Sequence, residues 1–309
     1  MPSCTMVRRR RSRRAPHATR LLDLARRSGD EFNFILTRYG LERLLFRLAS
    51  SHRDQFVLKG AMLFPLWSGS PHRATHDMDL LAFGPPNLDV IGNIFRDVAA
   101  VPADDGVTFL PDTVKVTQIR EDAVYDGIRV TLEGKLDGAR IPLQVDIGFG
   151  DDVAPLPIET AYPTLLEMPS PVLRVYPREA VVAEKFHAMV ELGLANSRMK
   201  DFYDIWFLAG GFEFDGGLLG AALRATFARR KTVLPTALPF ALTSDFENDP
   251  QKKIQWRAFV TKARLPNAAP DLAQVNARLR AFLTPVLAAL AQTNGSFGTW
   301  NHGTGWTKT

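Results

Sequence analysis

The segment Asp77-Met78-Asp79-Leu80-Leu81 constrains this chain more than any other. Side chains alternate along a β-strand, so Asp77 and Asp79 share one face while Met78 and Leu80 point into the core. Aspartate is unfavourable in strands, and two carboxylates on one face repel each other. A hard divalent cation such as Mg²⁺ offsets that cost because it takes carboxylate oxygens as ligands. A solvated strand end with two surface acids is the alternative, and the spacing alone favours neither.

A second candidate strand carries a third acid. In residues 142–148 the side chains of Leu143, Val145 and Ile147 share an apolar face, and Asp146 projects from the opposite face. Two strands of one small sheet can therefore place three carboxylates around a pair of cations. Two metal ions about 3.5–4 Å apart stabilise the attacking and leaving oxygens of an in-line phosphoryl transfer. We interpret Asp77, Asp79 and Asp146 as catalytic metal ligands, with Asp146 also able to act as a base.

A small-residue turn lies upstream of these acids. Residues 56–58 predict a short buried strand that ends in Lys59-Gly60-Ala61 and leads into an apolar, helix-like run to Trp67. Glycine at such a turn lets the backbone approach a phosphate, and the N-terminus of a following helix favours an anion. Taken alone, a Lys-Gly pair is better explained as a structural turn. Followed by the Asp pair, it predicts nucleotide binding by Lys59, Gly60 and Ala61.

The remaining pattern predicts an α+β organisation. Helical periodicity covers residues 19–51, where we expect Gly40 to separate two helices, and it dominates again over residues 178–291. Extended segments and turn glycines between them predict a small mixed sheet. We expect a basic disordered arm over residues 1–18, a helical lead-in with the core over 19–160, a C-terminal helical region over 161–292 and a flexible tail over 293–309.

Charge and composition narrow the functional classes. The net charge of +5 arises from six arginines within residues 8–14, so the rest of the chain is nearly neutral. Such an arm can neutralise nucleic-acid phosphates or stay solvated, and it lacks the apolar stretch of a secretory signal. The interpretation of this arm as an Arg-rich transit peptide also stays open. No apolar run reaches the roughly 20 residues of a spanning helix. The single cysteine, Cys4, excludes an internal disulfide and fits a reducing cytoplasm.

The order of these motifs resembles the polymerase-β-like nucleotidyltransferase superfamily. More narrowly, the chain resembles the AbiEii/AbiGii toxin nucleotidyltransferases, the toxin halves of toxin–antitoxin and abortive-infection modules, which include enzymes of the MenT type. The resemblance rests on FVLKGA at residues 56–61, RATHDMDL at 73–80, Lys185 and KDFYDI at 200–205. It extends over about residues 21–290. The superfamily usually has Gly-Ser or Gly-Gly at the turn, so Ala61 lacks a serine hydroxyl but keeps its backbone N–H.

This resemblance implies a polymerase-β-like core with a small mixed sheet, flanked by N-terminal helices and a C-terminal helical region. It implies Mg²⁺-dependent transfer of a nucleotide from an NTP, in some members to tRNA 3′ ends, which stops translation. It also implies that Lys185, on the edge of an apolar helix stripe, points toward the NTP phosphates.

Six further residues are interpreted from their own sequence context. Arg73 and Thr75 precede the Asp pair, and we expect both at the nucleotide, Arg73 on the triphosphate and Thr75 on the face of Asp77. Asp204 lies beside the apolar stripe of its helix; we expect it to brace Lys185 or the nucleotide and count it with the catalytic residues. Asp201 is interpreted as a structural first-turn acid. His72 and His76 are interpreted as loop histidines.

We therefore expect a cytoplasmic Mg²⁺-dependent toxin that transfers NMP from an NTP to RNA, with a tRNA 3′ end as the favoured acceptor and a cognate antitoxin protein as partner. Two alternatives stay open: nucleotidylation of a protein or small-molecule hydroxyl, and a catalytically silent protein that sequesters a partner. The presence of Asp77, Asp79, Asp146 and Lys185 together argues against a loss of catalysis.

Overall fold

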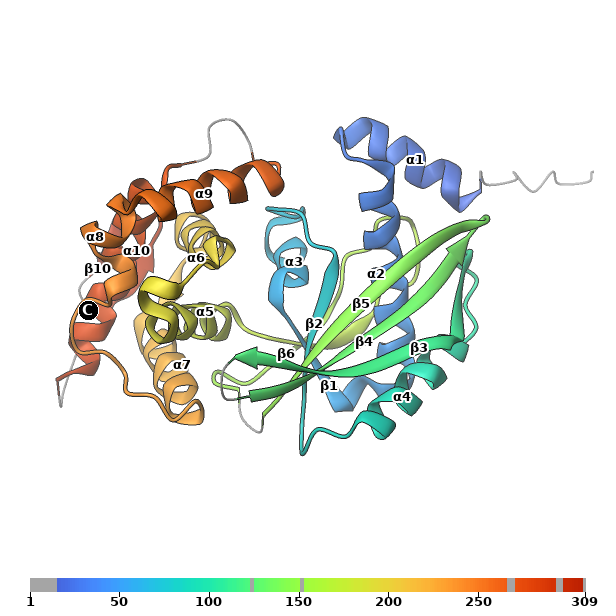
Figure 1. Ribbon diagram of the computed structural model, residues 1–309, viewed down its shortest axis with the longest axis horizontal. Coiled ribbons are helices and arrows are strands. Elements are labelled where there is room, and N and C mark those ends of the chain that lie inside the picture. The colour runs from blue at the N-terminus through green and yellow to red at the C-terminus, as the bar shows by residue number, and fades with distance from the viewer. Residues whose placement is uncertain (1–15, 123–124, 151–152, 266–269, 293–296, 308–309) are drawn as a thin grey trace, which may run out of the picture.

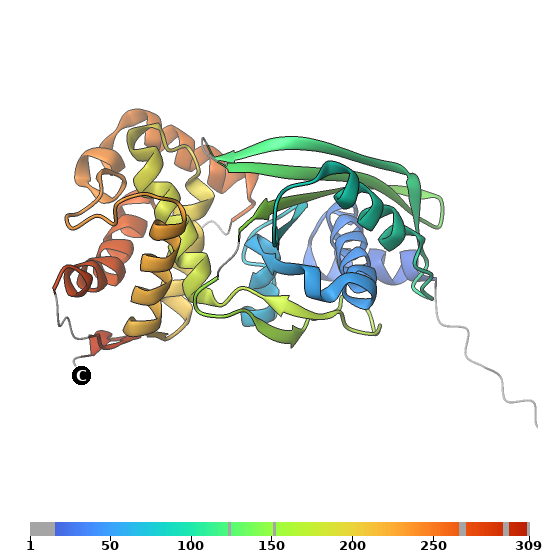
Figure 2. The same ribbon diagram turned by 90° about the horizontal axis from the view of Figure 1, so that it is seen from below.

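The computed structural model describes residues 16–122, 125–150, 153–265, 270–292 and 297–307. A sheet with the N-terminal helices forms one end of the molecule, and the C-terminal helices form the other (Figures 1 and 2). None of the described helices combines the length and apolar character needed to cross a bilayer.

Seven strands of the described residues form one mixed sheet in the order β3-β4-β5-β2-β1-β7-β6. β3, β4 and β5 form an antiparallel meander, β2 runs parallel to β5, and β1 runs antiparallel to β2 and parallel to β7. Leu58, Leu80 and Val145, on three adjacent central strands, are fully buried. The expected α+β fold with a mixed sheet is confirmed. The strand bounds are β1 Phe56–Lys59, β2 Asp77–Ala82, β3 Val107–Asp122, β4 Tyr125–Leu136, β5 Ala139–Phe149, β6 Ile158–Ala161 and β7 Val172–Val175.

Helix α1 His17–Ser28 packs against α2 Phe32–His52, and α2 and α4 Leu88–Ala100 pack against this sheet. The break between the first two lies at Gly29, whose left-handed conformation closes α1. The expected break at Gly40 is wrong, because Gly40 lies inside α2. A Cβ there would meet Ile141 Cγ2 at 2.8 Å, so glycine allows α2 to pack closely on β5.

The C-terminal half is helical. Its apolar core joins α5, α6, α7 and α10 through side chains such as Phe186, Phe202, Leu223 and Phe282, all fully buried. The helix bounds are α5 Arg178–Leu192, α6 Met199–Gly211, α7 Gly216–Arg229, α8 Ser244–Asn248, α9 Pro250–Lys262 and α10 Leu272–Leu290. Short elements complete the chain: α3 Phe64–Ser68 and the 3₁₀ turns η1 Arg53–Gln55, η2 Gly60–Leu63, η3 Gly193–Ala195 and η4 Phe240–Leu242.

The expectation of a flexible tail is wrong for residues 297–307. β9 Thr299–Asn301 pairs with β10 Gly305–Thr307 and with β8 Phe214–Asp215 in a small sheet. The Nε1–H of Trp300 donates to Ala209 O at 2.8 Å, and that of Trp306 donates to Phe282 O at 2.9 Å. The buried ring of Trp300 and the half-buried ring of Trp306, both with their N–H groups satisfied, outweigh the local Gly/Thr/Asn composition, which lacks periodicity.

Two other expected boundaries shift. Residues 1–15 of the arm lie outside the described residues, but His17 and Ala18 already belong to α1. The helical region begins at Arg178 instead of residue 161, because β7 still belongs to the main sheet through its pairing with β1. The division of the chain into an arm, a helical lead-in with the core, a C-terminal helical region and a tail stays a proposal.

A cluster of buried charges ties α2 to the loops around it. Arg47 forms a bidentate pair with Asp105 at 2.7 and 3.1 Å, and Arg43 donates to Pro169 O at 2.9 Å. Glu42 accepts the backbone N–H of Leu165 at 2.7 Å and is 2% exposed. Burial raises the pKa of Glu42 from its ordinary 4.5 to about 7, although the Leu165 N–H and Arg43 oppose the shift.

Because the pKa of Glu42 is raised in the folded chain, the free energy of unfolding should fall as pH rises. Between the unfolded and folded pKa values the folded chain holds a proton that the unfolded chain has lost, so unfolding becomes easier with increasing pH. Glu42→Gln should flatten this dependence between pH 5 and 8, a span worth roughly 3 kcal/mol. Urea unfolding at several pH values measures it, with exposed Glu159→Gln as the control. An unchanged slope in Glu42→Gln would contradict the assignment.

Candidate active site

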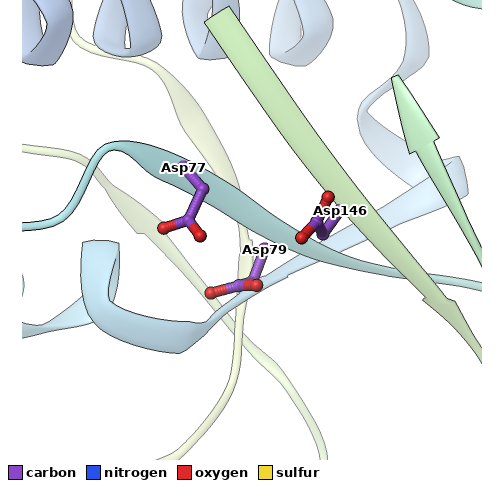
Figure 3. A group of neighbouring side chains, drawn as sticks. All are labelled: Asp77, Asp79 and Asp146. Atoms are coloured by element: carbon purple, nitrogen blue, oxygen red, sulfur yellow. The ribbon is translucent and has the colours of Figure 1, made fainter. Parts of the chain in front are cut away.

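Three carboxylates converge where β2 and β5 run side by side (Figure 3). Asp77 and Asp79 come from β2 and Asp146 from β5, and the register places Asp79 directly beside Asp146. One oxygen from each lies within 4.8 Å of the others, and all three residues are half-buried. Their neighbours Met78 and Val145 are fully buried on the opposite face. The predicted alternation is therefore what brings the three acids together.

This donor set fits a hard divalent cation. Carboxylate oxygens are the ligands that Mg²⁺ and Mn²⁺ prefer, and a cation here would relieve the repulsion among three like charges. Two neighbouring groups orient the oxygens. Thr75 Oγ1 donates to Asp77 Oδ1 at 2.7 Å, and Gln144 Nε2 donates to Asp146 Oδ2 at 3.3 Å. Thr75 thus lies on the face of Asp77, as its spacing suggested.

Arg129 is a site residue that sequence reasoning missed. It lies on β4 directly opposite Asp146, and its Nε and Nη2 donate to the two oxygens of Asp146, both at 2.8 Å. These bonds, together with the nearby Asp77 and Asp79, raise the pKa of Arg129. Alternation within residues 128–133 places Arg129 on a polar face, but the register between β4 and β5 is not visible in sequence. Any cation that binds Asp146 competes with this guanidinium.

Gly60 brings the predicted turn against the acids. Lys59 pairs with Asp79 in the β1–β2 register, and Gly60 follows with φ +74°. A Cβ at Gly60 would lie 2.0 Å from Asp79 Oδ2, so glycine is required both by the backbone conformation and by the close approach. The expected helix after the turn is short: η2 is followed by the five-residue α3. Little helix dipole is therefore available here.

A pocket rich in cations adjoins the triad. It is lined by Lys59, Gly60, Ala61, Arg73 and Lys185, and it shares Asp79 with the carboxylate group; Arg198, Lys200 and Arg230 add further positive charge. Glu184 also lines it. Burial alone would raise the pKa of Glu184, but Lys59, Arg229 and Arg230 lower it to about 2. The structure thus gathers the predicted turn residues, Arg73 and Lys185 around one space. We call this space the phosphate-sized pocket.

Behind this pocket lies a buried charge network that fixes two of its cations. Lys185 Nζ lies 2.7 Å from Asp201 Oδ1 and 2.8 Å from Asp204 Oδ2. Arg73 binds Asp204 through Nε at 2.7 Å and Nη2 at 2.8 Å, and His72 Nε2 lies 2.6 Å from the same carboxylate. Asp201 and Asp204 are fully buried. Asp204 therefore holds Lys185, as expected, and lies too deep to touch a nucleotide; it is a positioning residue.

Two residues differ from their expected surroundings. Asp201, interpreted as a first-turn acid, is also a partner of Lys185 and of Arg198 Nε at 2.7 Å. His72 lies in a loop, as expected, but its ring is fully buried and stacks on Phe64 with centroids 3.5 Å apart. Burial lowers the pKa of His72 against the pull of Asp204. His76 is exposed, as expected for a loop histidine.

The network keeps Lys185 cationic. Burial by itself disfavours the ammonium ion, but Asp201 and Asp204 outweigh it, and the pKa of Lys185 is raised. Burial likewise disfavours the ionised form of Asp204, yet Arg73 and Lys185 lower its pKa well below the ordinary value. Arg73 keeps less freedom than expected, because Asp204 occupies two of its nitrogens.

Comparisons with known proteins identify a matching family and structures that are similar to this chain. The family described as "Nucleotidyl transferase AbiEii toxin, Type IV TA system" matches residues 43–282. MenT4, a nucleotidyltransferase toxin from Mycobacterium tuberculosis H37Rv, has a similar fold, with a TM-score of 0.57 and 16% identity over 88% of this chain and 89% of that chain. JHP933 from Helicobacter pylori is 18% identical over 82% of this chain and 87% of that chain, with a TM-score of 0.44. No curated protein sequence matches the chain.

The Arg129–Asp146 pair generates a prediction about cation affinity. Arg129→Gln removes a positive charge that competes for Asp146, so Mn²⁺ should bind roughly three- to tenfold more tightly by calorimetry. Arg140→Gln is a matched control, because Arg140 pairs with Glu133 across the same two strands, away from the triad. Weaker Mn²⁺ binding in Arg129→Gln would instead mean that the arginine holds Asp146 in its ligating position.

Proposed function

The chain belongs to the AbiEii nucleotidyltransferase toxin family of type IV toxin–antitoxin systems, and we propose that it transfers NMP from an NTP to the 3′ end of RNA, with tRNA as the favoured acceptor. Membership makes the protein a nucleotidyltransferase with an NTP substrate and an antitoxin partner. The proposal adds Mg²⁺ dependence, the RNA acceptor, a block of translation as the consequence, and action in the cytoplasm.

One observation carries the proposal: an acidic triad and a cationic pocket meet at Asp79. Asp77, Asp79 and Asp146 would hold the metal, and Lys59, Lys185 and Arg73 would hold the phosphates. A bound pair of Mg²⁺ ions would supply charge neutralisation at the attacking and leaving oxygens. The triad and the cationic pocket adjoin, as they must if one nucleotide is to contact both the metal ions and the cationic side chains.

Each residue has a part in the transfer. The acceptor hydroxyl oxygen bonds to the α-phosphorus, the bond from that phosphorus to the β-phosphate oxygen breaks, and pyrophosphate leaves. Asp146 would take the hydroxyl proton, for which Arg129 must give up one of its two bonds. Lys185, held by Asp201 and Asp204, would stabilise the negative charge of the departing pyrophosphate. The backbone N–H groups of Gly60 and Ala61 serve the phosphates in place of the serine hydroxyl that Ala61 lacks.

Asp77→Asn and Lys185→Ala test these roles. The first removes a ligand charge without changing the side-chain volume, so metal-dependent transfer should be lost while the fold persists. The second removes an electrostatic contact worth roughly two to three decades in rate. Both variants should be non-toxic on expression, whereas the wild type should arrest growth. Exposed Asp89→Asn and Lys253→Ala are matched controls that should stay fully active.

The assay is transfer of α-³²P-labelled nucleotide to total RNA, purified protein or small hydroxyl compounds, together with circular dichroism. EDTA should abolish transfer, and Mg²⁺ or Mn²⁺ should restore it. Label on protein or small molecules alone would favour the alternative acceptor class. Binding without any transfer would favour a catalytically silent protein. Folded, active Asp77→Asn and Lys185→Ala variants, or transfer in excess EDTA, would show that the chemistry lies elsewhere.

A further inference from the structure

Arg129 occupies both oxygens of a carboxylate that is also a candidate metal ligand. Its Nε and Nη2 each donate to one oxygen of Asp146 at 2.8 Å. A carboxylate that ligates a cation has fewer lone pairs left for a guanidinium, and the two positive charges repel each other. Arg129 therefore gives up at least one of its two hydrogen bonds once Asp146 ligates a cation.

The surroundings of Arg129 allow its side chain to turn away from Asp146. The Arg129 side chain is 39% exposed, whereas that of Asp146 is 13% exposed. Thr117, the neighbour of Arg129 on β3, is also exposed. A guanidinium released from Asp146 therefore lies at the surface, next to the triad, with its charge available to an anion.

This surface is one face of the three strands β3, β4 and β5. Helix α2 packs on the other face, where a Cβ at Gly40 would meet Ile141 at 2.8 Å. Helix α4 packs there too, where a Cβ at Gly92 would meet Val116 at 3.3 Å. We call the face that bears Arg129 the open face. Its exposed residues are Thr108, Lys115, Thr117, Lys135, Arg140 and Pro142.

Positive charge gathers on the open face away from the triad. Arg140 pairs with Lys135 in the β4–β5 register, next to the hairpin that joins these strands, and both are exposed. Arg140 precedes Asp146 by six residues on β5, a span of about 20 Å. The six arginines of residues 8–14 precede α1, and its first residue adjoins the same hairpin, since a Cβ at Gly106 would meet both His17 and Leu136. An anionic strand along this face would thus have one end at the triad and the other near the chain's basic residues.

We propose that Arg129 is exchanged between Asp146 and the acceptor RNA: once Asp146 ligates a metal ion, the guanidinium turns to the 3′-terminal phosphodiester of an acceptor strand that lies along the open face. This inference rests on the proposed function and names how the acceptor of that site is held.

The reaction geometry identifies the phosphate that Arg129 meets. The proposed function places the attacking 3′ hydroxyl at Asp146, and one ribose separates that oxygen from the phosphodiester of the same nucleotide. Arg129 is the direct neighbour of Asp146 on the next strand, about 4.8 Å across the sheet. A guanidinium fork matches two phosphate oxygens as well as it matches two carboxylate oxygens. The same N–H donors can therefore serve Asp146 and the phosphodiester in turn.

The position of Arg129 assigns it to the acceptor and not to the NTP. The phosphate-sized pocket lies on the β1 side of β2, whereas Arg129 lies on β4, with β5 between β4 and β2. In-line attack comes from the side opposite the departing pyrophosphate. The acceptor strand therefore approaches over β5 and β4, where Arg129 lies.

An exchanged arginine couples two affinities. Without a metal ion, RNA must break the Arg129–Asp146 pair before it can use the guanidinium. With Asp146 engaged by a metal ion, that cost is already met, so the metal strengthens RNA binding. By linkage, RNA strengthens metal binding by the same factor.

The first measurement is RNA binding without metal or NTP, by fluorescence anisotropy of full-length protein in EDTA with a labelled single-stranded RNA that has a free 3′ hydroxyl. Asp146→Asn replaces two charge-assisted bonds by at most one neutral bond, so the freed Arg129 should tighten RNA binding roughly tenfold. Adding Arg129→Gln to this variant should remove the whole gain. Asp77→Asn is the matched control, because Asp77 carries the same charge in the triad but accepts from Thr75 instead of an arginine. It should tighten binding only about twofold.

The second measurement locates the contact in the wild-type protein, with Mg²⁺ present and NTP absent. An uncharged methylphosphonate linkage before the 3′-terminal nucleoside should weaken RNA binding roughly tenfold, and the same linkage five nucleotides upstream should have a smaller effect. In Arg129→Gln the two linkages should have equal effects. Arg140→Gln removes the same charge from the same face; it should weaken RNA binding but keep the larger effect of the 3′ linkage.

The outcomes separate this inference from the proposed function. Equal gains in Asp146→Asn and Asp77→Asn, with both folded by circular dichroism, would overturn the exchange. A larger effect of the 3′ linkage that persists in Arg129→Gln would do the same, and this comparison needs no change at Asp146. In either case a wild type that still labels RNA leaves the proposed function standing. A wild type that transfers nothing to RNA would overturn the proposed function and the inference with it.

Discussion

Like-charge repulsion among Asp77, Asp79 and Asp146 is the constraint on which the rest of the site depends. The sheet forces these carboxylates together because the apolar partners in β2 and β5, such as Met78 and Val145, bury on the other face. Once the pleat is set, the acids cannot separate without exposing the core. The chain offers partial relief through Arg129 and Thr75, and a divalent cation would complete it.

The acidic triad and Lys185 come from opposite ends of the molecule. The sheet supplies the acids, and α5 supplies Lys185, which is held by two buried carboxylates of α6. Asp204 also binds His72 and Arg73 from the loop before β2, so one carboxylate joins the C-terminal helices to the strand that bears Asp77. The network therefore fixes the position of Arg73 and Lys185 relative to the acidic triad. Removing Asp204 would leave Arg73 without its bidentate carboxylate partner and Lys185 with Asp201 alone, a costly change.

Local sequence patterns predicted much of this arrangement. Contacts between residues far apart in the sequence could not be predicted from such patterns. Strand alternation alone placed Asp77, Asp79 and Asp146 on the polar face, and spacing placed Thr75 beside them. Arg129 needed the β4–β5 register, and the His72–Asp204 pair joins residues 132 positions apart, which no period encodes. The predicted helix break at Gly40 was wrong because glycine occurs where a helix packs closely on a sheet as well as at helix ends. The C-terminal hairpin was missed because the hydrogen-bonded indoles of Trp300 and Trp306, not periodicity, hold it.

The most direct test of the central claim is anomalous diffraction from crystals grown with Mn²⁺ and a non-hydrolysable NTP analogue. We predict manganese peaks ligated by Asp77, Asp79 and Asp146, with the triphosphate between them and Lys185. Asp77→Asn crystals grown in the same way should lose at least one peak. Nucleotide bound elsewhere, or manganese absent from the triad while the protein remains active, would contradict the account.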